Sequence, residues 1–158
     1  MPWTEQLANL NELRRCVRDL VALSALPAGW QNYDMRQIGS SIVAALTSML
    51  DADFVFISLP GKGNQHVTEL TRGNLTLFAD ATSGQDLHVV TAPIGFGSDA
   101  ILAAGSRRDA FPTRTEKLLL NIGANQAAIA FQQRLGDAEK RRFTAVVQRT
   151  TDFVGIAR

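Results

Sequence analysis

The C-terminal third of the sequence constrains the fold most, because it reads as one helix that is too long for a compact domain. Thr113 and Glu116 stand three residues apart ahead of an apolar run, which is the spacing of a capping box. The apolar side of the run consists of Leu118, Leu119, Ile122, Ala127, Ile129, Ala130 and Phe131. A helix from Arg114 to about Gln148 would be roughly 50 Å long at about 1.5 Å per residue. We therefore expect its first half to cover a core and its second half to project.

Two shorter helices are predicted at the N-terminal end. Residues 4–24 carry an apolar stripe at spacings of three and four, with Thr4 as a plausible N-cap. Pro27 and Gly29 then interrupt the helical pattern. A second helix, 34–50, is predicted to start at Asp34, with Gln37 in the capping-box position.

The middle of the chain changes to the period of β-strands. Residues 53–60 are apolar on both faces apart from Ser58, which is typical of a central strand, and 66–72 alternate like a half-exposed strand. Residues 87–94 and 100–106 flank a glycine turn at 95–97 and predict a hairpin, whereas 73–86 are ambiguous. The order predicts an α+β fold: a central antiparallel sheet over 53–106 with the N- and C-terminal helices packed on one face.

The composition excludes several classes of protein. Lys and Arg number 16 and Asp and Glu number 15, so a net charge of +1 gives no electrostatic case for a nucleic-acid partner. The single cysteine, Cys16, excludes a disulfide framework and a Cys-based zinc site. No signal-like core appears, and no run approaches the roughly 18 apolar residues of a membrane helix. We expect a cytoplasmic protein with no membrane partner.

The segment LHVVTAPIGFGSDAILAAGSRRDAFPTRTEKLLLNIGANQAAIAFQ, residues 87–132, resembles the C-terminal half of a GAF domain. The features that carry the resemblance are the Pro93-Ile94 pair, the glycine turn, the small residues 103–106 and the spacing from Phe111 to Glu116. The helix that follows has the pattern Leu118-Leu119, Ala124, Gln126, Ala128 and Ala130. Upstream, IGSSIVAALTSMLDADFVFISL, residues 38–59, resembles the second helix and first strand of the same family. Together the match covers about residues 7–135, within a sensory domain assigned to 1–135.

More narrowly, the sequence is similar to GAF modules of bacterial multidomain sensor histidine kinases. The resemblance implies that residues 136–150 form a signalling linker helix. It also implies that residues 151–158, TDFVGIAR, begin a PAS domain. It also implies a regulatory, non-enzymatic module of a two-component system, with PAS and kinase domains following in the same chain. Known GAF ligand classes carry signatures that are missing here, so no cofactor is identifiable and the small-molecule ligand stays unknown.

A search for reactive groups finds no catalytic constellation and no metal set. His66 and His88 each open a strand without a second ligand at a recognisable spacing, so solvated or structural roles are favoured. Cys16 lies among arginines on the first helix, and a half-buried structural cysteine is the favoured interpretation. Arg107-Arg108 and residues 140–142 are interpreted as solvated basic clusters.

Two candidate sites remain. A ligand pocket is expected on the sheet face away from the terminal helices, from one-in-two positions on the strands: Phe54, Phe56, Leu70, Arg72, Val90 and Ala92. An error of one residue in the face assignment would swap every name. A parallel homodimer through the terminal helices is expected to use Leu10, Leu13, Val17, Leu20, Leu119, Ile122, Gln126 and Ile129. Two alternatives stay open: a ligand-free dimerisation scaffold, favoured by the short 73–86 segment, and a small-molecule enzyme, against which the missing nucleophile argues.

Overall fold

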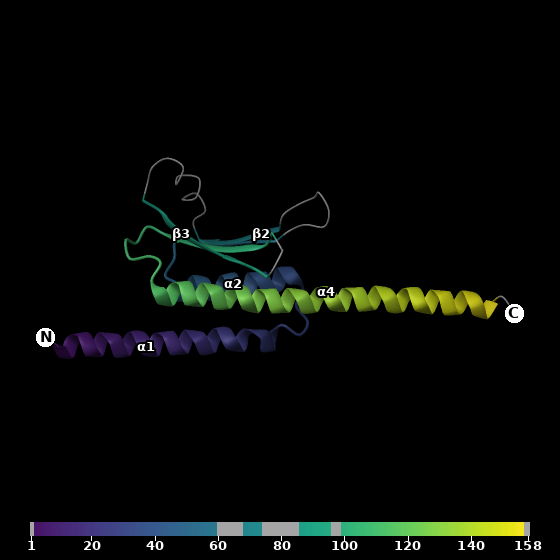
Figure 1. Ribbon diagram of the computed structural model, residues 1–158, viewed down its shortest axis with the longest axis horizontal. Helices are drawn as coiled ribbons and strands as arrows, with labels where there is room; N and C mark the ends of the chain where they lie inside the picture. Colours follow the sequence, from purple (N-terminus) through teal and green to yellow (C-terminus); the bar gives the residue numbers. More distant parts are fainter. Residues whose placement is uncertain (1, 60–67, 74–85, 96–98, 157–158) are drawn as a thin grey trace.

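The computed structural model describes residues 2–59, 68–73, 86–95 and 99–156, which form a four-stranded sheet with all its long helices on one side (Figure 1). The helices are α1 (Pro2–Ala25), the short 3-10 helix η1 (Leu26–Gly29), α2 (Met35–Met49) and α4 (Arg114–Ile156). The strands are β1 (Phe54–Leu59), β2 (Thr68–Gly73), β3 (His88–Pro93) and β4 (Ile101–Ser106). The predicted α+β class and antiparallel sheet are confirmed. Three parts of the sequence predictions lie outside the described residues: most of the ambiguous segment (residues 74–85), residues 96 and 97 of the glycine turn, and His66.

The strand order is β2-β1-β4-β3, and every neighbouring pair is antiparallel. β1 is therefore a central strand, as its two apolar faces predicted, and β3 and β4 form the expected hairpin pair. The helix-facing side of the sheet includes Val55, Ile57, Leu102 and Ala104, which are all fully buried in one core with residues of α2 and α4. This burial fixes which face of each strand the helices cover.

The helices form two layers rather than one. α2 and α4 contact the sheet, and α1 packs against α4 on the side away from the sheet (Figure 1). The terminal helices thus lie on one side of the sheet as predicted, with α1 in the outer layer and α2 beside α4 in the inner one (Figure 1). Asp19 and Leu23 of α1 are buried and Leu20 packs against the core, so only the C-terminal end of the apolar stripe contacts the core, and the rest of the stripe is exposed.

Local sequence signals explain where two of the helices begin. Asp34 Oδ1 accepts from the Gln37 backbone N–H at 2.8 Å, and Gln37 Oε1 accepts from the Asp34 N–H at 2.9 Å. Glu116 Oε2 accepts from the Thr113 N–H at 2.8 Å, and Thr113 Oγ1 accepts from the Glu116 N–H at 3.2 Å. Both predicted capping boxes are confirmed. α1 instead begins at Pro2, so the predicted start at Thr4 is wrong by two residues.

α4 continues to Ile156, past the predicted end at about Gln148. Residues 151–156, which the resemblance assigns to the start of a PAS domain, are helical and continuous with α4. Up to residue 150 the last buried residue of α4 is Phe131, and 137–150 are exposed throughout, so the second half projects as expected (Figure 1). Among the described residues, no helix is long and apolar enough to cross a membrane.

Candidate functional site

The sheet face away from the helices is one candidate site, and the strand register defines it. Phe56 pairs with Thr71 of β2 and Ala103 of β4, and Phe54 pairs with Gly105 of β4. Directly paired residues point to the same side of a sheet, so these positions share the helix-free face. Phe54 covers Gly105 so closely that a Cβ at residue 105 would lie 2.3 Å from the ring carbon Cε1. The Phe54 ring thus packs directly on the backbone of β4 on this face.

Only part of the predicted pocket lies there. Phe54 and Phe56 occupy the helix-free face, but Val90 pairs with Ala104 and Ala92 with Leu102, so both lie on the helix side. Leu70 and Arg72 pair with the helix-side positions 57 and 55. The expectation that all six share the free face is corrected. Apolar residues on both faces of β1, and the consecutive Val89-Val90 in β3, leave the sequence without an alternation that would set the face.

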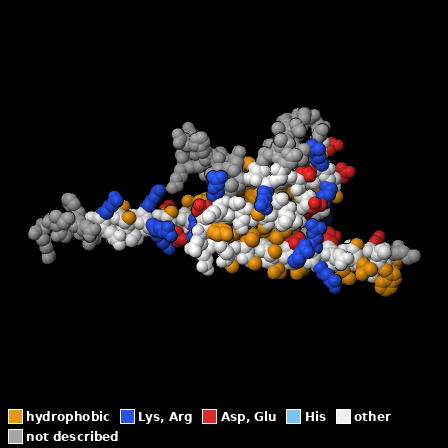
Figure 2. Space-filling model, turned by 180° about the vertical axis from the view of Figure 1, so that it is seen from behind, with side chains coloured by type: hydrophobic (Ala, Val, Ile, Leu, Met, Phe, Trp, Pro, Cys, Tyr) orange, Lys and Arg blue, Asp and Glu red, His pale blue; other side chains and the backbone are white. Residues whose placement is uncertain are grey.

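The outward face of α1 is the second candidate site. Leu10, Leu13 and Val17 are half or more exposed, at 51%, 60% and 51%, whereas Leu20 is only partly exposed. The exposed stripe also includes three residues outside the predicted set: Trp3, Leu7 and Val21. Spacings of three, four and seven residues place the stripe on one side of the helix, and Figure 2 shows hydrophobic side chains gathered toward the N-terminal end of α1.

On α4 the exposed stripe differs from the predicted one by one position at its start. Leu119 is buried in the core, Ile122 and Gln126 are partly exposed, and Ile129 is 56% exposed. Leu118, which is not among the predicted dimer residues, is 47% exposed. Further along, the projecting half exposes more apolar side chains: Leu135, Phe143, Val146 and Val147. α1 and α4 run in the same direction (Figure 1), which is the relation a parallel bundle needs.

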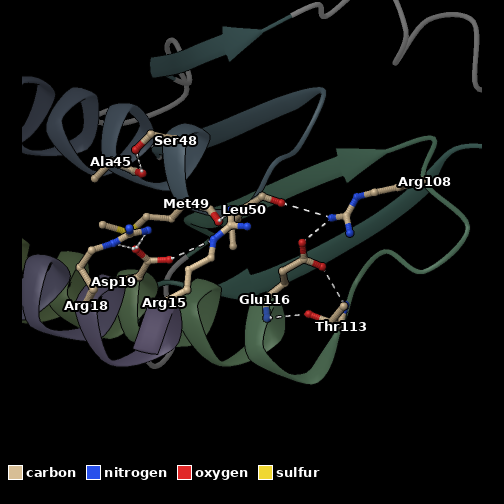
Figure 3. Close-up of polar contacts among 10 residues, drawn as sticks. All are labelled: Arg15, Arg18, Asp19, Ala45, Ser48, Met49, Leu50, Arg108, Thr113 and Glu116. Atoms are coloured by element: carbon tan, nitrogen blue, oxygen red, sulfur yellow. Dashed lines mark hydrogen bonds and ion pairs between the residues drawn. The ribbon is translucent and has the colours of Figure 1, made fainter. Parts of the chain in front are cut away.

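A polar cluster joins the end of the sheet to the first turn of α4 (Figure 3). Arg108, just after β4, donates to the Leu50 carbonyl oxygen at 3.3 Å and makes an ion pair with Glu116. Its guanidinium also lies 5.6 Å from the centre of the Phe111 ring. Glu116 therefore serves both the helix cap and the arginine. The interpretation of Arg108 as a solvated residue is wrong, although its neighbour Arg107 is exposed.

Residues of α1 also contact this cluster. Arg15 donates to the Met49 carbonyl oxygen at 3.5 Å, so two guanidinium groups reach the C-terminal carbonyls of α2 (Figure 3). Positive charges at the C-terminal end of a helix interact favourably with the helix dipole. Asp19 is 5% exposed, and its Oδ1 accepts from Arg18 Nε at 3.2 Å and Nη2 at 3.1 Å. Local spacing gave no signal for Arg108, because its acceptors come from distant parts of the chain.

A hollow of about 360 Å³ lies between α1 and the polar cluster. Its lining combines Cys16, Asp19 and Arg15 of α1 with Met49, Arg108 and Glu116 of the body. Cys16 is a half-buried free thiol, as the sequence indicated. Among the described residues, no group of three or more His, Cys, Asp or Glu side chains could hold a metal ion. His88 is half-buried at the start of β3.

The sequence matches no protein-family model. No curated protein matches it either. The structure is similar to a crystal structure of the GAF domain of a protein assigned as a sensor histidine kinase of Pseudomonas syringae pv. tomato. The TM-score is 0.58 at 13% sequence identity, and the match covers 90% of this chain and 99% of that one. The chain therefore has the fold of a GAF domain. The resemblance read from residues 7–135 is confirmed at the level of the fold.

Proposed function

We propose that this chain is the cytoplasmic sensory and dimerisation module of a bacterial two-component sensor histidine kinase, without enzymatic activity of its own. The observation that carries the proposal is α4. It starts at a cap tied to the end of the sheet through Arg108 and Glu116, and it continues without a break to Ile156. A rearrangement of the sheet or its loops therefore acts directly on the first turn of a helix that leaves the domain.

The proposal includes a parallel homodimer. The exposed residues Leu10, Val17 and Ile129 lie on two helices that run in the same direction. A second copy that packs along them would bury both stripes in a four-helix bundle. The exposed apolar residues of the projecting half continue that contact toward the PAS and kinase domains proposed to follow in the same chain.

The test uses the full-length gene product and its ATP-dependent autophosphorylation. One residue inserted after Gly136 turns everything beyond it by about 100°, whereas seven inserted residues return it to within about 20° of the original phase. Gly136 has no atom within 4 Å of the position of an added Cβ, so the site tolerates change. We expect the single insertion to change kinase output and the seven-residue insertion to restore it. Equal output from wild type and both variants would contradict signalling through α4.

The alternative of a ligand-free dimerisation scaffold makes a different prediction. Partial exposure of Phe56, in contrast to the buried Phe54, leaves apolar surface on the helix-free face of the sheet and favours a ligand there. Native mass spectrometry of the protein purified from its own host tests this point, together with thermal shifts across a metabolite panel. An empty protein with no thermal shift would favour the scaffold over the sensor.

A further inference from the structure

The point where α4 leaves the domain is held by one arginine. Arg134 comes three residues after Phe131, the last buried side chain of the helix up to residue 150. Its Nη2 donates to the carbonyl oxygens of Trp30 and Gln31, at 2.8 Å in the case of Gln31. These acceptors belong to the segment between η1 and α2. A single guanidinium thus joins the exit of α4 to a distant part of the chain.

The acceptor side of this contact is firmly anchored. Trp30 is 4% exposed, and its Nε1 donates to Ser41 Oγ of α2 at 3.2 Å. The Trp30 N–H donates to the Pro27 carbonyl oxygen at 3.1 Å, and the Trp30 carbonyl oxygen also accepts from the Tyr33 N–H at 3.0 Å. Because η1 follows directly on α1, a displacement of α1 is transmitted to the same carbonyl groups that hold Arg134.

The contact is built to be reversible. Both acceptors are neutral, and among the described side chains none forms an ion pair with Arg134 within 4.0 Å. Hollows of about 500 and 410 Å³ adjoin the arginine, and both are also lined by Gln31, Asn32 and Asp137. The guanidinium therefore has room to move. Asp137, three residues further along α4, supplies an alternative partner, since residues three apart face each other on a helix.

We propose that Arg134 is a latch that sets the direction in which α4 leaves the domain. When the latch is closed, Arg134 binds the Trp30 and Gln31 carbonyl oxygens and α4 is fixed to the segment after α1. When it is open, the guanidinium pairs with Asp137 and α4 is free from about residue 132. This inference deepens the proposed function, because it assigns a residue that couples α1 to α4, but its evidence is the geometry of this chain alone.

Hydrogen–deuterium exchange of the 158-residue chain tests the latch without any kinase. Arg134→Gln removes the charge and the reach, and Arg149→Gln is the matched control on an exposed arginine of the same helix, away from both hollows. Loss of a charge-assisted hydrogen bond corresponds to roughly tenfold faster exchange. We expect that increase for amides at 30–34 and 132–140 in Arg134→Gln, and no change in Arg149→Gln. Wild-type exchange rates in Arg134→Gln, with the strand amides still protected, would overturn the latch.

Asp137→Asn tests the open state separately. Without the competing carboxylate the closed state gains population, so the same amides should exchange more slowly than in wild type. Faster or unchanged exchange in Asp137→Asn would overturn Asp137 as the alternative partner. If Arg134→Gln itself unfolds, Arg134→Lys supplies the test, because a lysine keeps the charge but cannot serve both carbonyls in the same geometry. The exchange results can support the latch even if the insertions after Gly136 leave kinase output unchanged. The two proposals can therefore fail independently.

Discussion

The contact between Phe54 and Gly105 gives the sharpest test of the helix-free sheet face. In Gly105→Ala the new Cβ would lie 2.3 Å from ring atom Cε1 and 2.4 Å from Cζ. Optimal carbon–carbon separation is about 3.5–4.0 Å, so the ring must move by at least about 1 Å. Phe54 is 1% exposed, so the displaced ring meets tightly packed surroundings. We expect Gly105→Ala to lower the free energy of unfolding by about 2 kcal/mol, within the usual range for overpacking.

A double-mutant cycle separates the clash from other effects of the alanine. Phe54→Ala alone should cost about 3 kcal/mol through lost packing. In the Phe54→Ala background the clash is gone, and Ala in place of Gly in a strand should stabilise by about 0.5 kcal/mol. The same substitution therefore costs about 2 kcal/mol in one background and gains about 0.5 in the other, a coupling of about 2.5 kcal/mol.

Urea denaturation followed by circular dichroism measures all four proteins at one fixed protein concentration, since association would otherwise shift the midpoints. The slope of the transition should stay constant across the cycle, which shows that the midpoints report stability. If Gly105→Ala costs the same with and without Phe54, within about 0.5 kcal/mol, the ring does not rest on the glycine and the described face is wrong.

Two further predictions concern the helices. Glu116→Gln keeps an acceptor for the cap but removes the charge that pairs with Arg108, so the melting temperature should fall by roughly 4 °C. The control Glu139→Gln, on the exposed projecting half of α4, should leave the melting temperature within about 1 °C of wild type. Equal shifts in the two variants would show that the ion pair contributes nothing measurable. The double substitution Leu10→Lys and Val17→Lys should convert the dimer into a monomer in sedimentation experiments at micromolar concentration. The control Ala22→Lys, at a residue exposed on another side of α1, should leave the dimer intact. A wild-type protein that stays monomeric at high concentration would refute the bundle.

The elements and their order could be predicted from the sequence, because they depend on local signals. Both capping boxes combine an acceptor and a Glu or Gln at a fixed distance of three residues, and each marks a helix start correctly. The end of α4 was harder. The resemblance places the start of a new domain at 151–158, yet no proline or glycine stops the helix between Asp152 and Gly155, and the backbone is helical to Ile156.

The direction of α1 could not be predicted from its pattern. An apolar stripe indicates that a helix buries one side, but it does not say what covers that side. In α1 the stripe residues Leu10 and Val17 are exposed, and a carboxylate, Asp19, is buried together with Leu23. Asp19 is acceptable there because Arg15 and Arg18 of the same helix neutralise it. The helix thus carries the counterions of its buried carboxylate. The apolar stripe is exposed at its N-terminal end, whereas Leu23 is buried in the core.

The residues that connect distant elements carry no local signal at all. The spacing from Thr113 to Glu116 revealed the cap of α4, but the second partner of Glu116 lies eight residues earlier, and the acceptors of Arg134 lie more than one hundred residues earlier. Such pairs become visible only when strand order and helix packing are known. In this fold they occur at both places where α4 meets the domain, near its first turn and at its exit. An arginine at each place binds backbone carbonyl oxygens, those of Leu50 and of Trp30 and Gln31. The part of α4 that lies in the domain is therefore held by polar contacts near its first turn and at its exit, and by apolar packing between them.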